Sequence, residues 1–297
     1  MIFCLDCINA IKPSKKSKKN ALDLLKKLLI FDLYNLTEFE FSFKVKKNKI
    51  VKDIRFLSMD HNGYSCQNPR FFLKRVMLFE KIMATKCKNK DHKKVNSALR
   101  KVSKHPMDLY FGFDIKGGEY VFAFWLIFGG VKRNGKVSFW PYNFTKIINS
   151  SLKDVGLKKP KTLKRDILNL GFDIYKNEIR YKLYYLCRKM IMRDSAFAEL
   201  MSEINSKFAQ FKYFYFFSEM YNHQGKLVRE KMFLEFLEDI RNEDEKMIDT
   251  LLIKLKEIIG FSVSLGVLKT TLRKCGGRIS LISFELDGTL TFYIRST

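Results

Sequence analysis

Alternation of apolar and polar residues is the clearest pattern in the chain. Within residues 39–45 every second position is apolar, which is the period of a β-strand with one face packed against a core. A short turn at Lys47-Asn48 separates this run from a second strand-like run, residues 50–57. The two runs together predict a β-hairpin.

Four further hairpins are predicted along the chain. Their turns contain Gly, Asn or Asp, the residues that suit tight hairpin turns. The predicted strand pairs are residues 109–115 with 119–127, 169–174 with 178–186, 212–220 with 226–234, and 279–286 with 289–295. The second and third hairpins share one motif, Gly112-Phe113-Asp114-Ile115 and Gly171-Phe172-Asp173-Ile174. A unit that recurs about every 50 to 70 residues indicates internal repetition.

Helical periodicity occupies the segments between the hairpins. Apolar residues at helical spacing predict a helix capped by Asn20 and further helices over residues 69–85, 90–102, 143–155, 162–168, 193–208 and 235–259. Residues 261–272 fit a helix or a strand equally well. The acidic residues near the start of the last predicted helix are expected to form its solvated first turns; they are Glu238, Asp239, Glu243, Asp244 and Glu245.

These elements predict the fold class. Ten antiparallel strands remove their exposed edges most simply when the sheet closes on itself. We therefore expect an α+β protein: a closed ten-stranded antiparallel β-barrel of five hairpins, surrounded by α-helices. The expected unit is one domain over residues 1–297, with a basic N-terminal segment at residues 1–20.

Length and composition narrow the class of protein. The chain has 297 residues, of which 46% are hydrophobic and 29% charged, a balance that excludes a disordered chain. The longest apolar run, residues 121–128, is far shorter than the ~20 residues that span a bilayer. The N-terminus lacks the pattern of a signal peptide. We expect a soluble cytoplasmic protein.

The charge is strongly positive. Lys and Arg number 56 against 31 Asp and Glu, a net charge of +25, which favours a polyanionic partner such as nucleic acid, an acidic membrane, a diphosphate or an acidic peptide. An AT-rich coding sequence would produce many of these lysines without selection for a partner. Of the six cysteines only Cys4 and Cys7 are close in sequence, and they lack the second pair of ligands that a zinc site needs.

Cations recur on one face of several predicted strands. Because residues two apart share a face, Arg180, Lys182 and Tyr184 align in the third hairpin. Arg229, Lys231 and Phe233 align in the same way in the fourth, and every hairpin except the second presents a cation. The recurrence favours an anion site inside the barrel. The alternative is an open sheet whose Lys and Arg side chains face water.

The sequence resembles the ABBA (PT-barrel) aromatic prenyltransferases. It is most similar to their cyanobactin-type members, which prenylate peptides in RiPP biosynthesis. The likeness rests on five hairpins interleaved with helices, on Arg-x-Lys-x-Tyr in a return strand and on the Gly-Phe-Asp hairpins. Glu40, Lys44 and Arg55 stand at positions corresponding to the family's catalytic Glu and two cations. Ala123 and Trp125 depart from the Lys-x-Tyr pair that the family usually has in its second hairpin.

The resemblance implies a transfer of an isoprenoid, dimethylallyl or geranyl, from its diphosphate to a peptide or small aromatic acceptor. The cations that this transfer needs for the diphosphate are Arg55, Arg180, Lys182, Arg229 and Lys231. The rings that would shield the allyl cation are Trp125, Tyr184, Phe233 and Tyr293. Glu40 is expected to act as general base or, alternatively, as the partner of an inward cation. The resemblance also implies Mg²⁺, but the sequence does not indicate its ligands.

A second function remains open at this stage. The net charge and the many aromatic residues also suit a nucleic-acid-binding protein without catalytic activity. The two functions differ in where the cations lie. A nucleic-acid strand needs them along an outer groove, whereas prenyl transfer needs them to converge inside the barrel.

Overall fold

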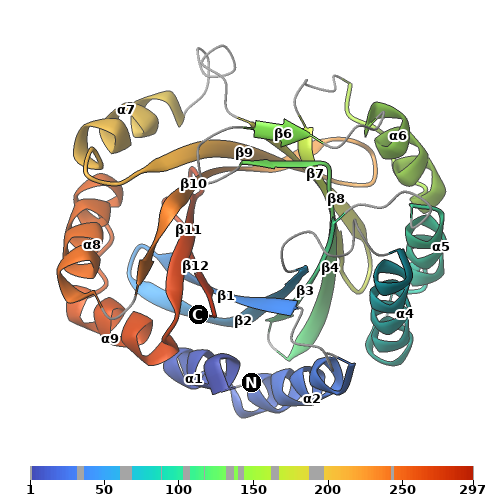
Figure 1. The fold of residues 1–297 in the computed structure, drawn as a ribbon, viewed down its shortest axis with the longest axis horizontal. Helices are drawn as coiled ribbons and strands as arrows, with labels where there is room; N and C mark the ends of the chain where they lie inside the picture. Colours follow the sequence, from blue (N-terminus) through green and yellow to red (C-terminus); the bar gives the residue numbers. More distant parts are fainter. Residues whose placement is uncertain are drawn as a thin grey trace.

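The computed structural model describes residues 2–31, 37–60, 69–87, 89–102, 108–116, 118–131, 137–139, 144–161, 167–186, 197–241 and 244–296. Ten strands form a closed antiparallel barrel, in the order β1-β12-β11-β10-β9-β8-β7-β4-β3-β2 (Figure 1). The strands are β1 (Thr37–Lys46), β2 (Lys49–Asp60), β3 (Asp108–Lys116), β4 (Glu119–Ile127), β7 (Ile167–Ile174), β8 (Ile179–Leu186), β9 (Tyr213–Tyr221), β10 (Leu227–Arg241), β11 (Arg278–Phe284) and β12 (Leu290–Arg295).

The predicted fold class is confirmed. All five predicted hairpins are present, and β12 pairs with β1 to close the barrel, with Glu40 opposite Arg295 and Lys44 opposite Thr291. A small sheet of β5 (Gly129–Val131) and β6 (Val137–Phe139) was not predicted from the sequence. Its strands have three residues each, too short for a periodic pattern to show.

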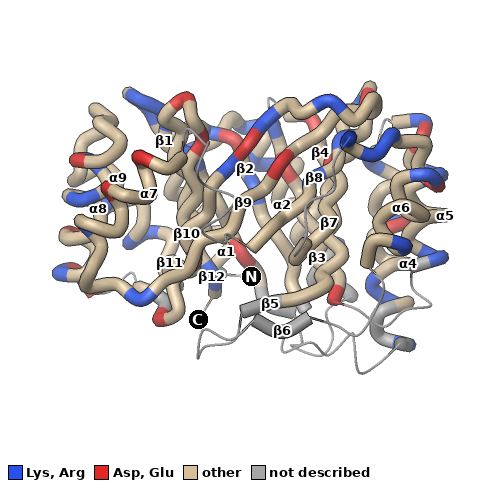
Figure 2. Tube along the Cα trace, turned by 90° about the horizontal axis from the view of Figure 1, so that it is seen from above, with Lys and Arg blue, Asp and Glu red and all other residues tan. Residues whose placement is uncertain are grey.

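Helices surround the barrel as an outer ring (Figure 1). They are α1 (Ile2–Ile11), α2 (Lys15–Phe31), α4 (Pro69–Lys86), α5 (His92–Val102), α6 (Phe144–Val155), α7 (Phe197–Lys207), α8 (Glu245–Ile259) and α9 (Leu265–Cys275). Within the described ranges, each helix is either too short or too polar to cross a lipid bilayer. Lys and Arg residues are spread over the helices on both sides of the barrel (Figure 2).

The first helices begin earlier than the sequence predicted. Residues 1–20 were expected to form only a basic segment, yet α1 and the start of α2 lie there. The cap of α2 is Ser14 and not Asn20, since the Ser14 hydroxyl accepts a hydrogen bond from the backbone N–H of Ser17 at 3.1 Å. The Asn20 side chain instead donates to the carbonyl of Gly118 at 2.9 Å, and so ties α2 to the turn between β3 and β4.

The prediction of one helix over residues 235–259 was wrong in its first third. Strand β10 continues to Arg241, because Ile240 and Arg241 still pair with β11. Glu238 and Asp239 therefore lie in a strand, and the helix begins only at Glu245. Asp244 caps this helix, accepting a hydrogen bond from the N–H of Met247 at 3.0 Å. Strand pairing overrode the local helical preference here.

Three other segments complete the comparison. Residues 261–272, which fitted either element, lead into α9. The end of the helix predicted over residues 162–168 was wrong, because Ile167 and Leu168 belong to β7, and residues 162–166 lie outside the described ranges. Residues 193–196 of another predicted helix, and Glu243, also lie outside them. The described part of that helix, α7, begins at Phe197.

The core lies between the outer face of the barrel and the helices. Phe79 of α4 illustrates it: its ring stacks on Phe111 with centroids 4.4 Å apart. The same ring meets Phe113, Phe122 and Phe124 at about 6 Å, so one helix residue joins β3 and β4. Outward Phe residues thus hold the helices, which leaves the inward face of each strand available for other side chains.

Replacing Phe79 by Ala should lower the free energy of unfolding by about 3–5 kcal/mol, because it removes a fully buried ring and leaves a cavity. Met77→Ala is the matched control, since Met77 lies on the same helix and is 57% exposed. Urea unfolding followed by circular dichroism measures both. Equal stabilities for the two variants would contradict this account of the core.

Candidate functional site

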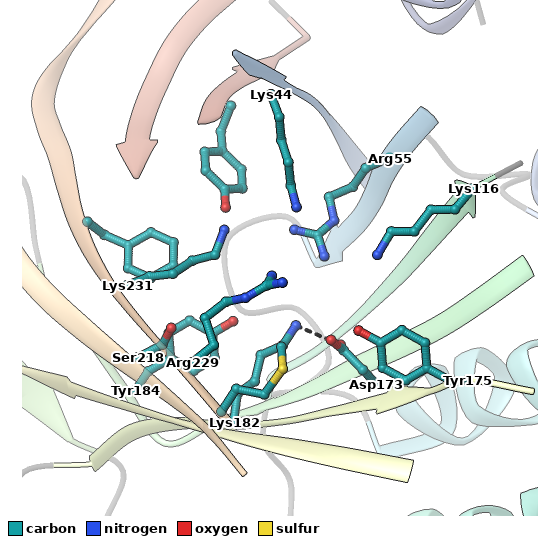
Figure 3. A pocket seen from close by; sticks show the side chains of 13 residues that line it. Lys44, Arg55, Lys116, Asp173, Tyr175, Lys182, Tyr184, Ser218, Arg229 and Lys231 are labelled. Atoms are coloured by element: carbon teal, nitrogen blue, oxygen red, sulfur yellow. Dashed lines mark hydrogen bonds and ion pairs between the residues drawn. The ribbon is translucent and has the colours of Figure 1, made fainter. Parts of the chain in front are cut away.

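A hollow lies inside the barrel, toward the end where the hairpin turns are. Its empty space measures about 410 Å³, which includes space open to solvent at its mouth. The side chains that line it come from strands all around the barrel (Figure 3). They are Lys44, Arg55, Lys116, Asp173, Tyr175, Lys182, Tyr184, Ser218, Met220, Arg229, Lys231, Phe233 and Tyr293.

The charge of this lining is mainly positive. Six cations from five strands point toward a common centre (Figure 3): Lys44, Arg55, Lys116, Lys182 and, both on β10, Arg229 and Lys231. Side chains that share a charge repel one another, so a cluster of this kind inside a barrel needs counter-ions.

Three carboxylates supply the counter-ions. Asp173 contacts Lys182 at 2.6 Å, and Glu285 contacts Lys231 at 2.7 Å and Arg229 at 3.3 Å. Asp114 binds Arg55 through both of its oxygens and lies 3.4 Å from Lys116. Asp114 and Asp173 are buried, and the side chain of Glu285 is 9% exposed. The cations of the lining therefore outnumber the carboxylates that they contact by six to three.

Burial shifts the pKa values of two lysines in this cluster. Burial lowers the pKa of Lys231 to about 7, although Glu285 opposes the shift. Burial, together with the nearby Arg55, lowers the pKa of Lys44 to about 8. Both ammonium groups are therefore close to losing their protons at neutral pH. A bound anion would favour the protonated form of each.

Arg55 and Asp114 form the firmest ion pair in the hollow. They lie opposite each other on β2 and β3. Burial alone would raise the pKa of Asp114, yet Arg55 and Lys116 hold it well below its usual range. The carboxylate thus stays ionised, and the guanidinium cannot lose its proton in practice.

Aromatic side chains form the layer beneath the cations. Phe216 and Phe233 stack with centroids 4.6 Å apart, and Phe233 also meets the rings of Tyr184 at 5.7 Å and Tyr293 at 6.1 Å. Leu168 and Leu281 complete this buried cluster. Its surface is apolar and rich in π-electrons, which suits a hydrocarbon chain or a carbocation.

Trp125 covers the wall beside this layer. A Cβ atom added at Gly112 or at Gly171 would lie 2.6 Å from the indole ring, so both residues must be glycine for Trp125 to lie flat against β3 and β7. The indole N–H donates to the hydroxyl of Tyr184 at 2.9 Å, and the Lys182 ammonium lies 5.3 Å from the ring centroid.

Two carboxylates lie at the far end of the aromatic layer. The buried Glu40 accepts a hydrogen bond from Nε of Arg295 at 3.1 Å. Glu235 lies 3.9 Å from the same guanidinium. Arg295 therefore bridges β1 and β10 through one carboxylate from each strand.

Along a single strand, the inward residues run in the same order: first a cation, then an aromatic ring, then a carboxylate. Along β10 they are Lys231, Phe233 and Glu235, that is, a cation, a ring and a carboxylate. Along β1, the Cα atoms of Lys44 and Glu40 are four residues apart, about 13 Å along the strand. Ser42 lies between them, opposite Tyr293 of β12. The lumen is thus divided along its axis into a level of cations, an aromatic level and a carboxylate level.

Two solved structures share this architecture. NotF, crystallised in complex with brevianamide F and DMSPP, superposes with a TM-score of 0.63 at 11% identity, covering 99% of this chain and 92% of that one. AnaPT from Neosartorya fischeri superposes with a TM-score of 0.52 at 13% identity, covering 86% of this chain and 77% of that one. Both are ABBA-type aromatic prenyltransferases. The chain has the ABBA prenyltransferase fold. Neither a family model nor a curated protein matches the sequence.

The ABBA barrel brings together most of the residues that the sequence singled out. Those that line the hollow are Arg55, Lys182, Arg229, Lys231, Tyr184, Phe233 and Tyr293. Arg180 is not among the lining residues: its guanidinium pairs with Glu178 and lies 4.9 Å from the ring of Tyr175. Trp125 and Glu40 also stand outside the lining, as described above.

Several site residues were missed from the sequence. The second hairpin was expected to present no cation, but Lys116 at the end of β3 lines the hollow. Lys44 was placed on the polar face of its strand without being assigned to the diphosphate. The repeated Gly-Phe-Asp motif was the available signal for Asp114 and Asp173: in each copy Gly faces Trp125, Phe packs outward and Asp pairs with an inward cation. Glu285 had no comparable signal.

A magnesium ion does not fit the carboxylates of the hollow. Mg²⁺ needs oxygen ligands that are free to coordinate it. Asp114, Asp173 and Glu285 instead hold Lys or Arg side chains. Among the residues that the structure describes, no cluster of three or more His, Cys, Asp or Glu could hold a metal ion.

Anion affinity should fall as the pH rises, because Lys44 and Lys231 bind an anion only when protonated. The charged groups that interact with this pair or with its partner Glu285 are Asp53, Arg55, Asp114, Lys116 and Arg229. Sulfate does not titrate in the neutral range, so its binding isolates the protein's own protonation. From about pH 6 to pH 9 the affinity should decrease at least about tenfold. Calorimetric titration at several pH values tests this, and a pH-independent affinity would contradict it.

Proposed function

We propose that the protein is a prenyltransferase, which moves an isoprenoid from its diphosphate to a nucleophilic, aromatic side chain of a peptide acceptor. The observation that carries the proposal is the order of the three levels in the lumen. Prenyl transfer needs a cationic site for the diphosphate, a ring-lined space for the allyl group and a carboxylate near the acceptor, in that sequence. The inward face of β10 has this sequence in Lys231, Phe233 and Glu235.

The cations would act on the leaving group. In the reaction the bond between the allylic carbon and the diphosphate oxygen breaks, and its electron pair goes to the oxygen. Arg55 can bind phosphate oxygens through its planar fork, and Lys44, Lys182 and Lys231 add compact charges around it. These groups are in place before the reaction, so negative charge develops against fixed positive charges in a buried site.

The rings would act on the carbon. The allyl group becomes positive as the diphosphate leaves, and the faces of Tyr184, Phe233 and Tyr293 can stabilise it by about 0.5–2 kcal/mol each. Trp125 extends this surface along β4, where the two glycines hold it flat. The same rings exclude water, which would otherwise react with the carbocation to give an alcohol.

Glu40 is the base in this proposal. The acceptor's nucleophilic atom bonds to the allylic carbon, and its proton passes to a carboxylate. Glu40 is buried, lies below the aromatic level and is held in place by Arg295. The pairing with Arg295 also fits the alternative expectation, in which Glu40 only holds an inward cation. If Glu40 is the base, the variant Glu40→Gln should still bind the donor but lose transfer.

The donor and acceptor classes are supported by the shared fold. NotF was crystallised with DMSPP and brevianamide F, which supports an isoprenoid diphosphate and an aromatic acceptor for an ABBA barrel. The peptide nature of the acceptor follows only from the resemblance of the sequence to the cyanobactin-type enzymes. Dimethylallyl and geranyl diphosphate are the donors to test.

Nucleic-acid binding fits the structure less well. A site for a nucleic-acid strand needs cations gathered along an outer groove. Six cations instead converge inside the barrel, and the outer Lys and Arg residues are spread over helices on opposite sides (Figure 2).

Incubation with dimethylallyl or geranyl diphosphate and a panel of peptides containing Trp or Tyr should yield adducts of one isoprenoid mass. Lys44→Met should weaken donor binding about tenfold or more, since it removes one charged hydrogen-bond donor. It should leave the free energy of unfolding unchanged or higher, because burial already disfavours the Lys44 charge. Mass spectrometry, calorimetry and urea unfolding give the three readouts.

Lys46→Met is the matched control, because Lys46 lies on the same strand two residues away and is exposed. It should behave as the unmodified protein. Absence of any adduct, combined with salt-sensitive binding of generic RNA, would contradict the proposal and favour a nucleic-acid-binding protein.

A further inference from the structure

The three carboxylates of the hollow have no role in the transfer described so far. Asp114, Asp173 and Glu285 do not suit a metal ion, and each lies against cations that the diphosphate would need. A carboxylate in an anion site weakens the binding of the anion, both by repulsion and by competing for the same cations. Their presence inside an anion site therefore calls for a function.

Geometry makes these carboxylates direct competitors of a bound anion. Asp173 lines the hollow itself, next to the Lys182 ammonium that it binds at 2.6 Å. Glu285 follows β11, where its backbone N–H bonds to the carbonyl of Thr289 at 2.9 Å, and its carboxylate reaches two cations of β10. The carboxylates sit on short side chains, whereas each lysine has a flexible stem of four carbons. A lysine can thus turn from carboxylate to ligand while the backbone stays in place.

Release of the leaving group creates the need for such competitors. Inorganic diphosphate has one more ionisable oxygen than its ester, so a purely cationic site would hold the product more tightly than the donor. A cation that loses its anion inside a barrel is also left unpaired, at a large cost in desolvation. A carboxylate within reach removes that cost, because it takes the cation back when the anion departs.

We propose that Asp114, Asp173 and Glu285 are built-in counter-ions that compete with diphosphate for the cations of the hollow and so allow the product to leave. This inference rests on the proposed function. It makes the three carboxylates determinants of product release.

The test is a titration of the purified full chain with inorganic diphosphate, which needs no turnover. Asp114→Asn is the first variant, because Arg55 keeps its charge at any working pH and is freed when the carboxylate is removed. We expect Asp114→Asn to bind inorganic diphosphate about tenfold more tightly than the unmodified protein. A purely structural role for Asp114 predicts the opposite sign, since Arg55 would lose the group that positions it.

Glu285→Gln is the second variant, in case Asp114→Asn does not fold. Its affinity is measured at about pH 6. Removing the Glu285 carboxylate lowers the pKa of Lys231 further, and the lower pH helps to keep this lysine protonated. Asp154→Asn is the matched control for net charge, because Asp154 pairs at 2.7 Å with Lys101 on the outer helices. It should not change the affinity. In steady-state assays the hollow variants should show product inhibition at about tenfold lower diphosphate concentration.

The outcomes separate the two claims. If neither the unmodified protein nor the folded hollow variants bind inorganic diphosphate, the proposed function and this inference both fail. If the unmodified protein binds diphosphate and the folded hollow variants bind it equally or more weakly, only the role of the carboxylates is overturned. Tighter binding in the hollow variants, with Asp154→Asn unchanged, supports the inference.

Discussion

The ion pairs between the lysines and arginines of the lumen and a smaller number of carboxylates are the interaction on which this lumen depends. Six cations cannot share one hollow unless counter-ions lower their repulsion, and Asp114, Asp173 and Glu285 lower it only in part. Burial, with a smaller contribution from the neighbouring cations, lowers the pKa of Lys44 and Lys231, and three cations remain in excess over the carboxylates. An anion that entered would complete a charge balance that the protein alone leaves open.

The alternation of the strands makes such a lumen compatible with a stable protein. Outward residues such as Phe113 and Phe172 pack into the core shared with the helices, and they carry the burial that folding needs. Inward residues are then free to serve the lumen, although charged groups there oppose folding. Gly112 and Gly171 show both demands in one motif: the missing side chain admits Trp125, and the Asp two residues later holds a cation.

The sequence predicted the barrel because each hairpin has a period of two and a turn of its own, and five such units leave few arrangements without open edges. It predicted Lys182, Arg229 and Lys231 on the inward face for the same reason, since residues two apart share a face. It missed Lys116 because the predicted strand ended at residue 115, one residue too early. It expected Arg180 at the diphosphate, whereas the structure pairs this side chain with Glu178. The extent of β10 was mistaken because pairing with β11 is a contact distant in sequence.

The most direct measurement is a crystal structure of the protein with a non-hydrolysable isoprenoid diphosphate analogue. The account predicts that the diphosphate lies among Lys44, Arg55 and Lys231, with its hydrocarbon chain against Tyr184 and Phe233 and pointing toward Glu40. A diphosphate bound to lysines of the outer helices, with the inward cations still paired to their carboxylates, would contradict it.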